Sequence, residues 1–186
     1  MMTHTKEKTA LASIIRDRRA VKKKYNDKPV EAETVLDILE DAKYAPTHKL
    51  RQPWRFVFVD GARKEAFAKR VAATYPPERQ ANREKVLLEP SAFLIVIMDA
   101  PEEQKQWDEN FGATACMIQN FWLLAWEQGL GAVWKTNSHI YNPEVRDLLG
   151  VRSDEKIVGF IHLGYFDNKP PTKNRIPAAE KFTMYK

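Results

Sequence analysis

Apolar residues recur at helical spacing along much of the first half of the chain. This spacing predicts a helix around residues 11–15, a second over residues 29–45 and a third over residues 62–73. The second helix is expected to stop near Ala45, because Pro46 disfavours a helical residue before it. Residues 74–85 are polar and contain two adjacent prolines, so we expect a loop that leads into a short helix.

Other stretches have the pattern of β-strands. Aromatic and β-branched residues alternate over residues 55–60 and predict a strand there. Residues 93–98 form a continuous apolar run between two prolines, which is typical of a strand buried on both faces. Two further strands are expected over residues 132–136 and 157–163, with a short helix over residues 142–149 between them.

The most apolar helix is predicted from about Glu109 to Gln128, and Gly129 is expected to end it. This helix is apolar nearly all round, so it is expected to be buried in a core or in a subunit interface. Residues 164–186 contain prolines and little helical pattern, and such an arm usually needs a partner surface. Residues 1–8 are expected to be flexible. These elements predict one α+β domain over residues 1–186, with a central sheet, a long buried helix and an extended C-terminal arm.

Composition narrows the class of protein. With 44% apolar residues in 186, the chain fits a single globular domain. No apolar run approaches the roughly 20 residues of a membrane-spanning helix, and no secretory signal is visible at the N-terminus. Cys116 is the sole cysteine, which excludes an intramolecular disulfide. The expected location is therefore the reducing cytoplasm, with no membrane association.

The net charge of +5 includes a dense basic run from Arg16 to Lys24. Such a run is either a solvated helix end or an anion site. A nucleic-acid-binding role is not expected, because no recognition helix or RNA-binding aromatic motif accompanies the run. No metal site is expected either, since the histidines lack metal-ligand spacing, and His162 is interpreted as a core residue of a strand. The pair Gly129 and Gly131 ends a helix instead of opening one, which argues against a Rossmann nucleotide site.

Four segments carry more information together than singly. They are Arg18-Arg19-Ala20-Val21-Lys22, residues 45–56 with the sequence APTHKLRQPWRF, residues 129–136 with the sequence GLGAVWKT, and residues 159–165 followed by Pro170, Pro171 and Arg175. In this order the chain resembles the nitroreductase family of FMN-dependent oxidoreductases, in particular its small single-domain bacterial branch. The resemblance implies an α+β sandwich with a mainly antiparallel sheet, which forms an intertwined homodimer through the long helix and exchanged termini.

The resemblance also implies a site for the FMN phosphate. Arg18 and Arg19 would supply bidentate cations, and Ala20 would contribute a backbone contact where relatives usually carry serine. Arg175 matches a late basic residue that often completes the phosphate clamp.

The resemblance implies further cofactor contacts at the end of the predicted strand over residues 132–136 and near the end of the second helix. Trp134, Lys135 and Thr136 would contact the cofactor, and Lys135 and Thr136 would reach its phosphate or ribityl chain. Tyr44 would lie near the same end of the cofactor.

The ring would be held by the loop that follows the second helix. His48 and Gln52 would contact the pyrimidine edge, and Lys49 or Arg51 would place positive charge near it. No general acid or base is required, because the protein holds the flavin and exposes one ring face. The implied function is hydride transfer from NAD(P)H through flavin N5 to a nitroaromatic, quinone or similar acceptor by a ping-pong mechanism. The alternative is a low-turnover FMN carrier or redox-responsive protein.

Overall fold

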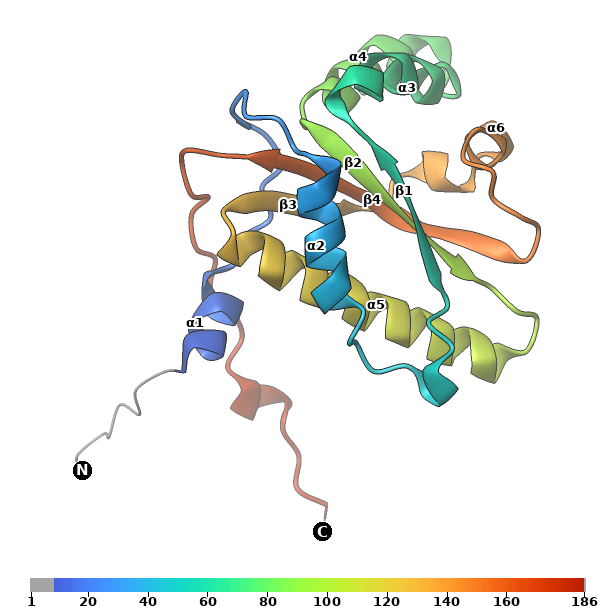
Figure 1. Cartoon of the computed structure of the whole chain (residues 1–186). Coiled ribbons are helices and arrows are strands. Elements are labelled where there is room, and N and C mark those ends of the chain that lie inside the picture. Colours follow the sequence, from blue (N-terminus) through green and yellow to red (C-terminus); the bar gives the residue numbers. More distant parts are fainter. Residues whose placement is uncertain (1–8, 186) are drawn as a thin grey trace.

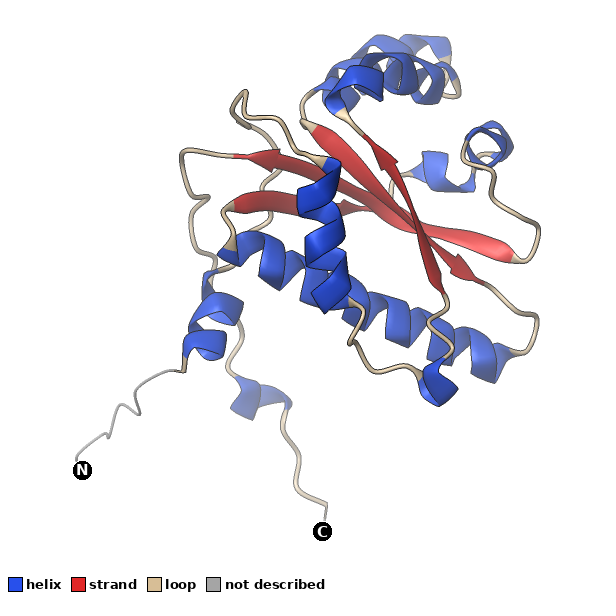
Figure 2. Ribbon diagram, viewed as in Figure 1, coloured by secondary structure: helices blue, strands red, loops and turns tan. Residues whose placement is uncertain are grey.

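The fold is a four-stranded sheet with helices on both faces, as the ribbon diagrams show (Figures 1 and 2). It is described by a computed structural model that covers residues 9–185, so the expectation for residues 1–8 lies outside the described residues. The elements in chain order are α1 (Ala10–Asp17), α2 (Ala32–Ala42), η1 (His48–Leu50), β1 (Trp54–Val59), α3 (Gly61–Ala73), α4 (Pro77–Leu88), β2 (Ala92–Asp99), α5 (Gln104–Glu127), β3 (Leu130–Lys135), η2 (Ser138–Tyr141), α6 (Pro143–Leu148), β4 (Glu155–Tyr165) and η3 (Ala178–Lys181).

The strand order is β1-β2-β4-β3, and each neighbouring pair is antiparallel. Strand β2 lies inside the sheet, and its residues from Ala92 to Met98 are all buried, as the continuous apolar run predicts. Its side chains alternate between two cores. Leu94 and Val96 pack with α2 and α5, whereas Phe93 and Ile95 pack with α3, η2 and α6. The predicted α+β fold class is therefore confirmed.

Helix α5 crosses one face of the sheet along its whole length (Figure 1). It begins at Gln104, several residues before the predicted start, and ends before Gly129, whose φ of 72° is the left-handed conformation that suits glycine. One side of α5 is buried against the sheet, including Met117 and Phe121. The opposite side of α5 is exposed at Gly112 and Cys116. A single chain therefore does not bury this helix on all sides.

Helix α4 is the main difference from the predicted elements. It spans Pro77–Leu88 as a 12-residue helix, where the sequence predicted a loop leading into a short helix. Pro77 occupies the first turn, where its fixed φ and missing N–H are tolerated. Leu87 is the only residue of α4 that is buried, so the apolar periodicity that would have indicated its full length is weak.

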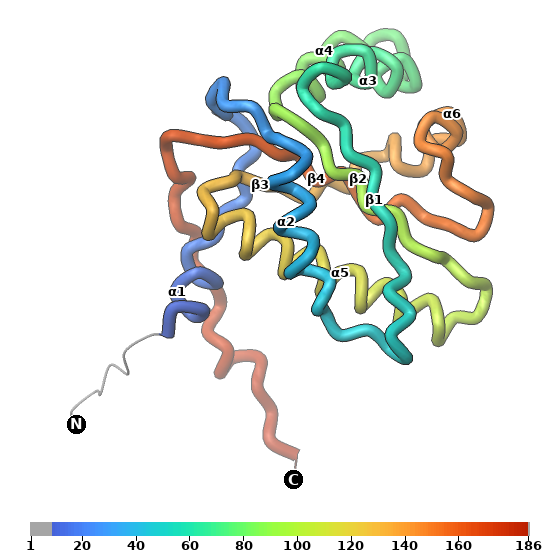
Figure 3. The backbone as a smooth tube through the Cα atoms, in the orientation of Figure 1, coloured from blue at the N-terminus to red at the C-terminus, as the bar shows by residue number. Residues whose placement is uncertain are grey.

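The two terminal segments pack loosely and lie on the same side of the molecule (Figure 3). Helix α1 has no buried residue. The C-terminal arm begins on its own chain, with the ring of Phe166 stacked on Trp126 at a centroid distance of 5.3 Å. From residue 171 to residue 185 every side chain is exposed, including the apolar Ile176 and Phe182.

Candidate cofactor site

Three arginines lie close together where α1, α5 and the C-terminal arm meet. They are Arg18, Arg19 and Arg175. The guanidinium of Arg18 stacks on the indole of Trp122, 4.1 Å from the ring centroid. Burial, and then the nearby charges of Arg175 and Arg19, lower the pKa of Arg18. Within residues 9–185, none of the three arginines has a carboxylate within ion-pair distance. The positive charge here is therefore unmatched, which is the electrostatic requirement of an anion site.

Arg19 is also a structural residue. Its Nη1 donates hydrogen bonds to the carbonyl oxygens of Arg16, Asp17 and Arg18, at 2.8, 2.9 and 3.0 Å, and so satisfies the C-terminal end of α1. Its Nη2 donates to the Thr172 hydroxyl at 2.5 Å, which ties the arm to α1. Arg19 stays a predicted phosphate ligand, but its loss would disturb the helix end and the arm as well.

The chain beyond Arg19 runs beside β3. Ala20 forms a parallel bridge with Ala132, and the Val21 amide donates to the Ala132 carbonyl at 3.2 Å. Ala20 thus makes a backbone contact with the sheet, whereas the resemblance implied a backbone contact with the phosphate. Lys22 lies four residues after Arg18 in an extended segment, so the two are about 13 Å apart along the edge of the sheet.

A second cationic group lies at the far end of this segment. Burial lowers the pKa of Lys135, and the charges of Lys22 and Arg83 lower it further, while Glu89 opposes them. Lys22 is exposed, whereas Lys135 and Arg83 are half-buried. Arg83 was not predicted from the sequence, because it lies on the sparsely apolar helix α4. Residues 18–22 therefore connect two groups of positive charge.

The predicted contacts Trp134, Lys135 and Thr136 lie in different surroundings. Trp134 faces α5, and its Nε1 donates to the Val158 carbonyl at 3.1 Å. A Cβ at Gly159 would overlap its indole, so that glycine makes room for the ring. Lys135 points to the opposite face by strand alternation, and Thr136 is exposed just beyond β3. Only Lys135 of the three is thus close to the other cations.

A small cavity with several titratable side chains in its lining lies next to Lys135. Arg83, Lys135, His139 and His162 line it with Tyr75, whose hydroxyl hydrogen-bonds to Nδ1 of His139 at 2.7 Å. Burial lowers the pKa of His139 to about 4 and that of His162 to about 3. Both rings are therefore neutral at pH 7, and the prediction that His162 is a buried strand residue is confirmed.

The loop predicted to hold the flavin ring is exposed and conformationally unusual. Lys49, Leu50 and Gln52 have φ values of 53°, 52° and 47°, in the left-handed region that non-glycine residues seldom occupy. Such conformations are concentrated at functional sites. His48 and Gln52 are both exposed.

Of the two cations predicted near the ring, Arg51 forms an ion pair, whereas Lys49 forms none within residues 9–185. Arg51 donates to Glu109 of α5 at 2.7 Å, so its charge is neutralised locally and does not supply the free cation expected near the ring. His48, Lys49 and Arg51 line an open cavity of about 170 Å³ with residues 103–109. Tyr44, just after α2, is 82% exposed.

The loop and the arginines lie at opposite ends of α5 (Figure 1). The loop contacts Glu109, whereas Arg18 contacts Trp122. Trp122 lies thirteen residues after Glu109 in the helix, which corresponds to about 20 Å along its axis. One chain therefore does not bring the predicted phosphate ligands and the predicted ring ligands together.

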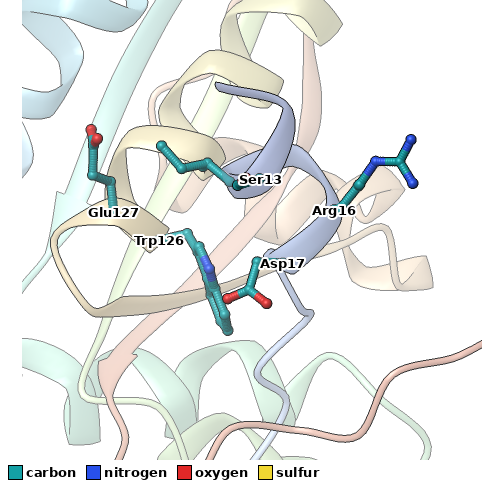
Figure 4. A pocket seen from close by; sticks show the side chains of 6 residues that line it. Ser13, Arg16, Asp17, Trp126 and Glu127 are labelled. Carbon is teal, nitrogen blue, oxygen red and sulfur yellow. The ribbon is translucent and has the colours of Figure 1, made fainter. Parts of the chain in front are cut away.

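A larger groove of about 520 Å³ lies between α1 and the C-terminal end of α5 (Figure 4). The indole of Trp126 lies beside the carboxylate of Asp17 in this groove, and Lys169 of the arm pairs with the same carboxylate.

No helix among residues 9–185 combines the length and apolarity needed to cross a membrane. The same residues contain no cluster of three or more side chains suited to hold a metal ion.

The chain is similar to known proteins over nearly its whole length. The sequence profile of the Nitroreductase family matches residues 15–165. YfhC of Bacillus subtilis, which carries the provisional name NAD(P)H nitroreductase, is 36% identical over 183 residues, with 94% of each chain covered. A nitroreductase-like family protein from Bacillus cereus is 37% identical and has a TM-score of 0.89, covering 97% of this chain and 98% of its own. A provisionally named nitroreductase from Desulfovibrio desulfuricans, solved in complex with FMN, shares the fold at 22% identity, with a TM-score of 0.76 and coverage of 96% and 98%.

Proposed function

The chain belongs to the nitroreductase family, and from this premise we propose that it is a homodimeric, FMN-dependent NAD(P)H oxidoreductase. Its acceptor would be a nitroaromatic, a quinone or a similar small molecule, reduced in a ping-pong reaction. When bound, FMN supplies a ring that accepts hydride at N5 and passes it on. The cytoplasm remains the expected location.

The observation that carries the proposal is the unmatched charge of the arginine group. Arg18 and Arg19 each have a buried Nε without a hydrogen-bond partner among the described residues. Buried donors of this kind are costly unless a ligand or water satisfies them. A phosphate dianion supplies both the missing charge and the missing acceptors, so these residues fit the FMN phosphate.

The second cationic group fits the other end of the same molecule. FMN is elongated, with its phosphate at one end and its ring at the other. Residues 18–22 separate the two groups by about 13 Å along the edge of the sheet. Lys22, Arg83 and Lys135 would then hold positive charge beside the ring, a place for Lys135 that differs from the phosphate or ribityl contact implied by the resemblance. Such charge favours the anionic reduced flavin.

The homodimer supplies what one chain lacks. If two α5 helices pack antiparallel, the loop at the N-terminal end of one approaches the arginines at the C-terminal end of the other. His48 and Gln52 of the partner copy would then reach the cofactor bound near Arg18. The apolar residues left exposed on the terminal segments support an extensive contact between copies, and they are Leu11, Ile15, Ile176, Phe182 and Met184.

The absorbance spectrum of the purified protein tests the proposal. We expect the bands of bound oxidised flavin, bleached anaerobically by NADPH or NADH and restored by a nitroaromatic or a quinone. Bleaching by dithionite but by neither nicotinamide would instead support a flavin carrier. Protein that neither retains nor takes up FMN would contradict both functions.

A further inference from the structure

Trp122 is a side chain of α5 that the proposed function leaves unused. Its indole packs partly against the core and carries the guanidinium of Arg18 on its face, 4.1 Å from the ring centroid. Its Nε1 is buried and has no hydrogen-bond partner among residues 9–185. The neighbouring Nε of Arg18 is also buried and unpartnered. Two N–H donors from different elements are thus left without an acceptor in the same place.

The arrangement contrasts with two other tryptophans, whose N–H groups have acceptors within the chain. The Nε1 of Trp134 has a carbonyl acceptor on Val158. Trp126 has the carboxylate of Asp17 beside its indole. A buried N–H without an acceptor costs free energy, so the Trp122 donor needs a partner that the described chain does not provide.

We propose that Trp122 is a positioning residue of the cofactor site, which holds Arg18 by stacking and donates its own N–H to the phosphate group of FMN. This inference rests on the proposed function. Stacking covers the face of the guanidinium and leaves its in-plane N–H groups free to bind phosphate oxygens. It also fixes a side chain that no carboxylate holds, so less conformational freedom is lost when the phosphate binds.

Substitutions at Trp122 separate stacking from donation. Trp122→Phe keeps an aromatic face and loses the N–H, and we expect FMN to bind about 3-fold more weakly. Trp122→Leu loses both, and we expect a loss of about 10-fold. Trp126→Phe, one turn further along the same helix, is the matched control and should leave FMN affinity unchanged. Affinities are measured by quenching of flavin fluorescence on titration with apoprotein at fixed salt.

Riboflavin and a double variant show whether the effect acts through the phosphate. Riboflavin lacks the phosphate, so its affinity should be the same in the wild type and both Trp122 variants. Arg18→Ala combined with Trp122→Leu should bind FMN only about 3-fold more weakly than Arg18→Ala alone, because without Arg18 the stacking has nothing to hold and only the Trp122 N–H is lost. Circular dichroism of each apoprotein checks folding, and Trp122→Phe provides the result if Trp122→Leu does not fold.

The outcomes distinguish the inference from the proposed function. Wild-type protein that binds FMN while both folded Trp122 variants bind it equally well would overturn the role of Trp122 and leave the proposed function intact. Equal losses for riboflavin and FMN would also overturn it, because the residue would then act on the ring or the fold. Wild-type protein that fails to bind FMN would overturn the proposed function, and this inference with it.

Discussion

At the scale of single residues, Arg18 and Arg19 are neighbours in the sequence with different surroundings. Arg19 bonds to three carbonyl groups at the end of α1 and to Thr172 of the arm. The Arg18 side chain makes no hydrogen bond or ion pair among the described residues, and its guanidinium stacks on Trp122. In the sequence the two arginines form a single motif. In the structure, only the Arg18 side chain has all its N–H groups available for a bound anion.

We therefore expect Arg18→Ala to weaken FMN binding by about 10- to 150-fold, the loss of one charge-assisted hydrogen bond, without lowering the stability of the apoprotein. Arg19→Ala should lower both affinity and stability, because it also removes a helix cap. Flavin titrations and melting curves measure the two effects. Arg16→Ala, on the exposed surface of the same helix, is the control. Unchanged affinity in Arg18→Ala would remove the phosphate assignment.

The buried histidines predict a loss of stability in acid. His139 and His162 have ordinary pKa values of 6.5 that burial lowers to about 4 and about 3 in the folded state. Between pH 6.5 and these lower values the unfolded chain binds protons that the folded chain does not, so stability falls as the pH falls. From pH 7 to pH 5 each histidine should contribute a loss of about 2 kcal/mol.

Urea unfolding at the two pH values measures this loss. His162→Gln should reduce the difference, and His48→Gln, at an exposed position, should preserve it. A pH difference that is the same in all three proteins would show that the buried rings do not cause it.

At the scale of secondary structure, prediction succeeded where apolar residues pack on a defined surface. The patterns of α2, β1, β2 and β4 gave these elements to within a few residues, because their apolar positions face the two cores. Helix α4 was underestimated, since it buries one residue. The separation of the loop from the arginines could not be derived in advance, because it depends on which end of α5 each segment contacts. Arg83 and Trp122 likewise acquire their surroundings only in the folded chain.

The exposed side of α5 provides a prediction about the interface. A Cβ at Gly112 would meet no atom within 4 Å, so the single chain accommodates a larger residue there. We expect Gly112→Trp to preserve the fold but to release monomers, because its side chain would separate two packed α5 helices. Sedimentation velocity and circular dichroism measure both properties.

Lys85→Trp, at an exposed position of α4 on the other face of the sheet, is the control and should remain dimeric. If the Gly112→Trp protein remains dimeric, the interface between the two copies does not involve this side of α5.

At the scale of the whole molecule, the distance along α5 makes the proposed site a property of two chains. One copy would contribute Arg18 and the second cationic group, and its partner would contribute the loop with His48 and Gln52. A chain on its own holds two incomplete halves about 20 Å apart. The apolar terminal segments and the exposed side of α5 would then stabilise the same assembly that completes the site.

Mixed dimers test this arrangement. Arg18→Ala is combined with a His48→Ala, Gln52→Ala double variant, each carrying a different affinity tag. If sites are shared between chains, the mixed dimer contains one wild-type site and one doubly defective site. FMN titration should then show about half of the wild-type sites at full affinity, although both parent homodimers bind weakly. A mixed dimer in which all sites bind weakly would place each site within a single chain.

The contact between the two terminal segments also bears on the order of events during synthesis. The last strand of the sheet ends at Tyr165, whereas the arginine group requires Arg175 and the link from Arg19 to Thr172. A growing chain can therefore complete its sheet before the ribosome has made its full set of phosphate ligands. Cofactor loading would then follow translation, and a product truncated after β4 would keep the fold while holding FMN poorly.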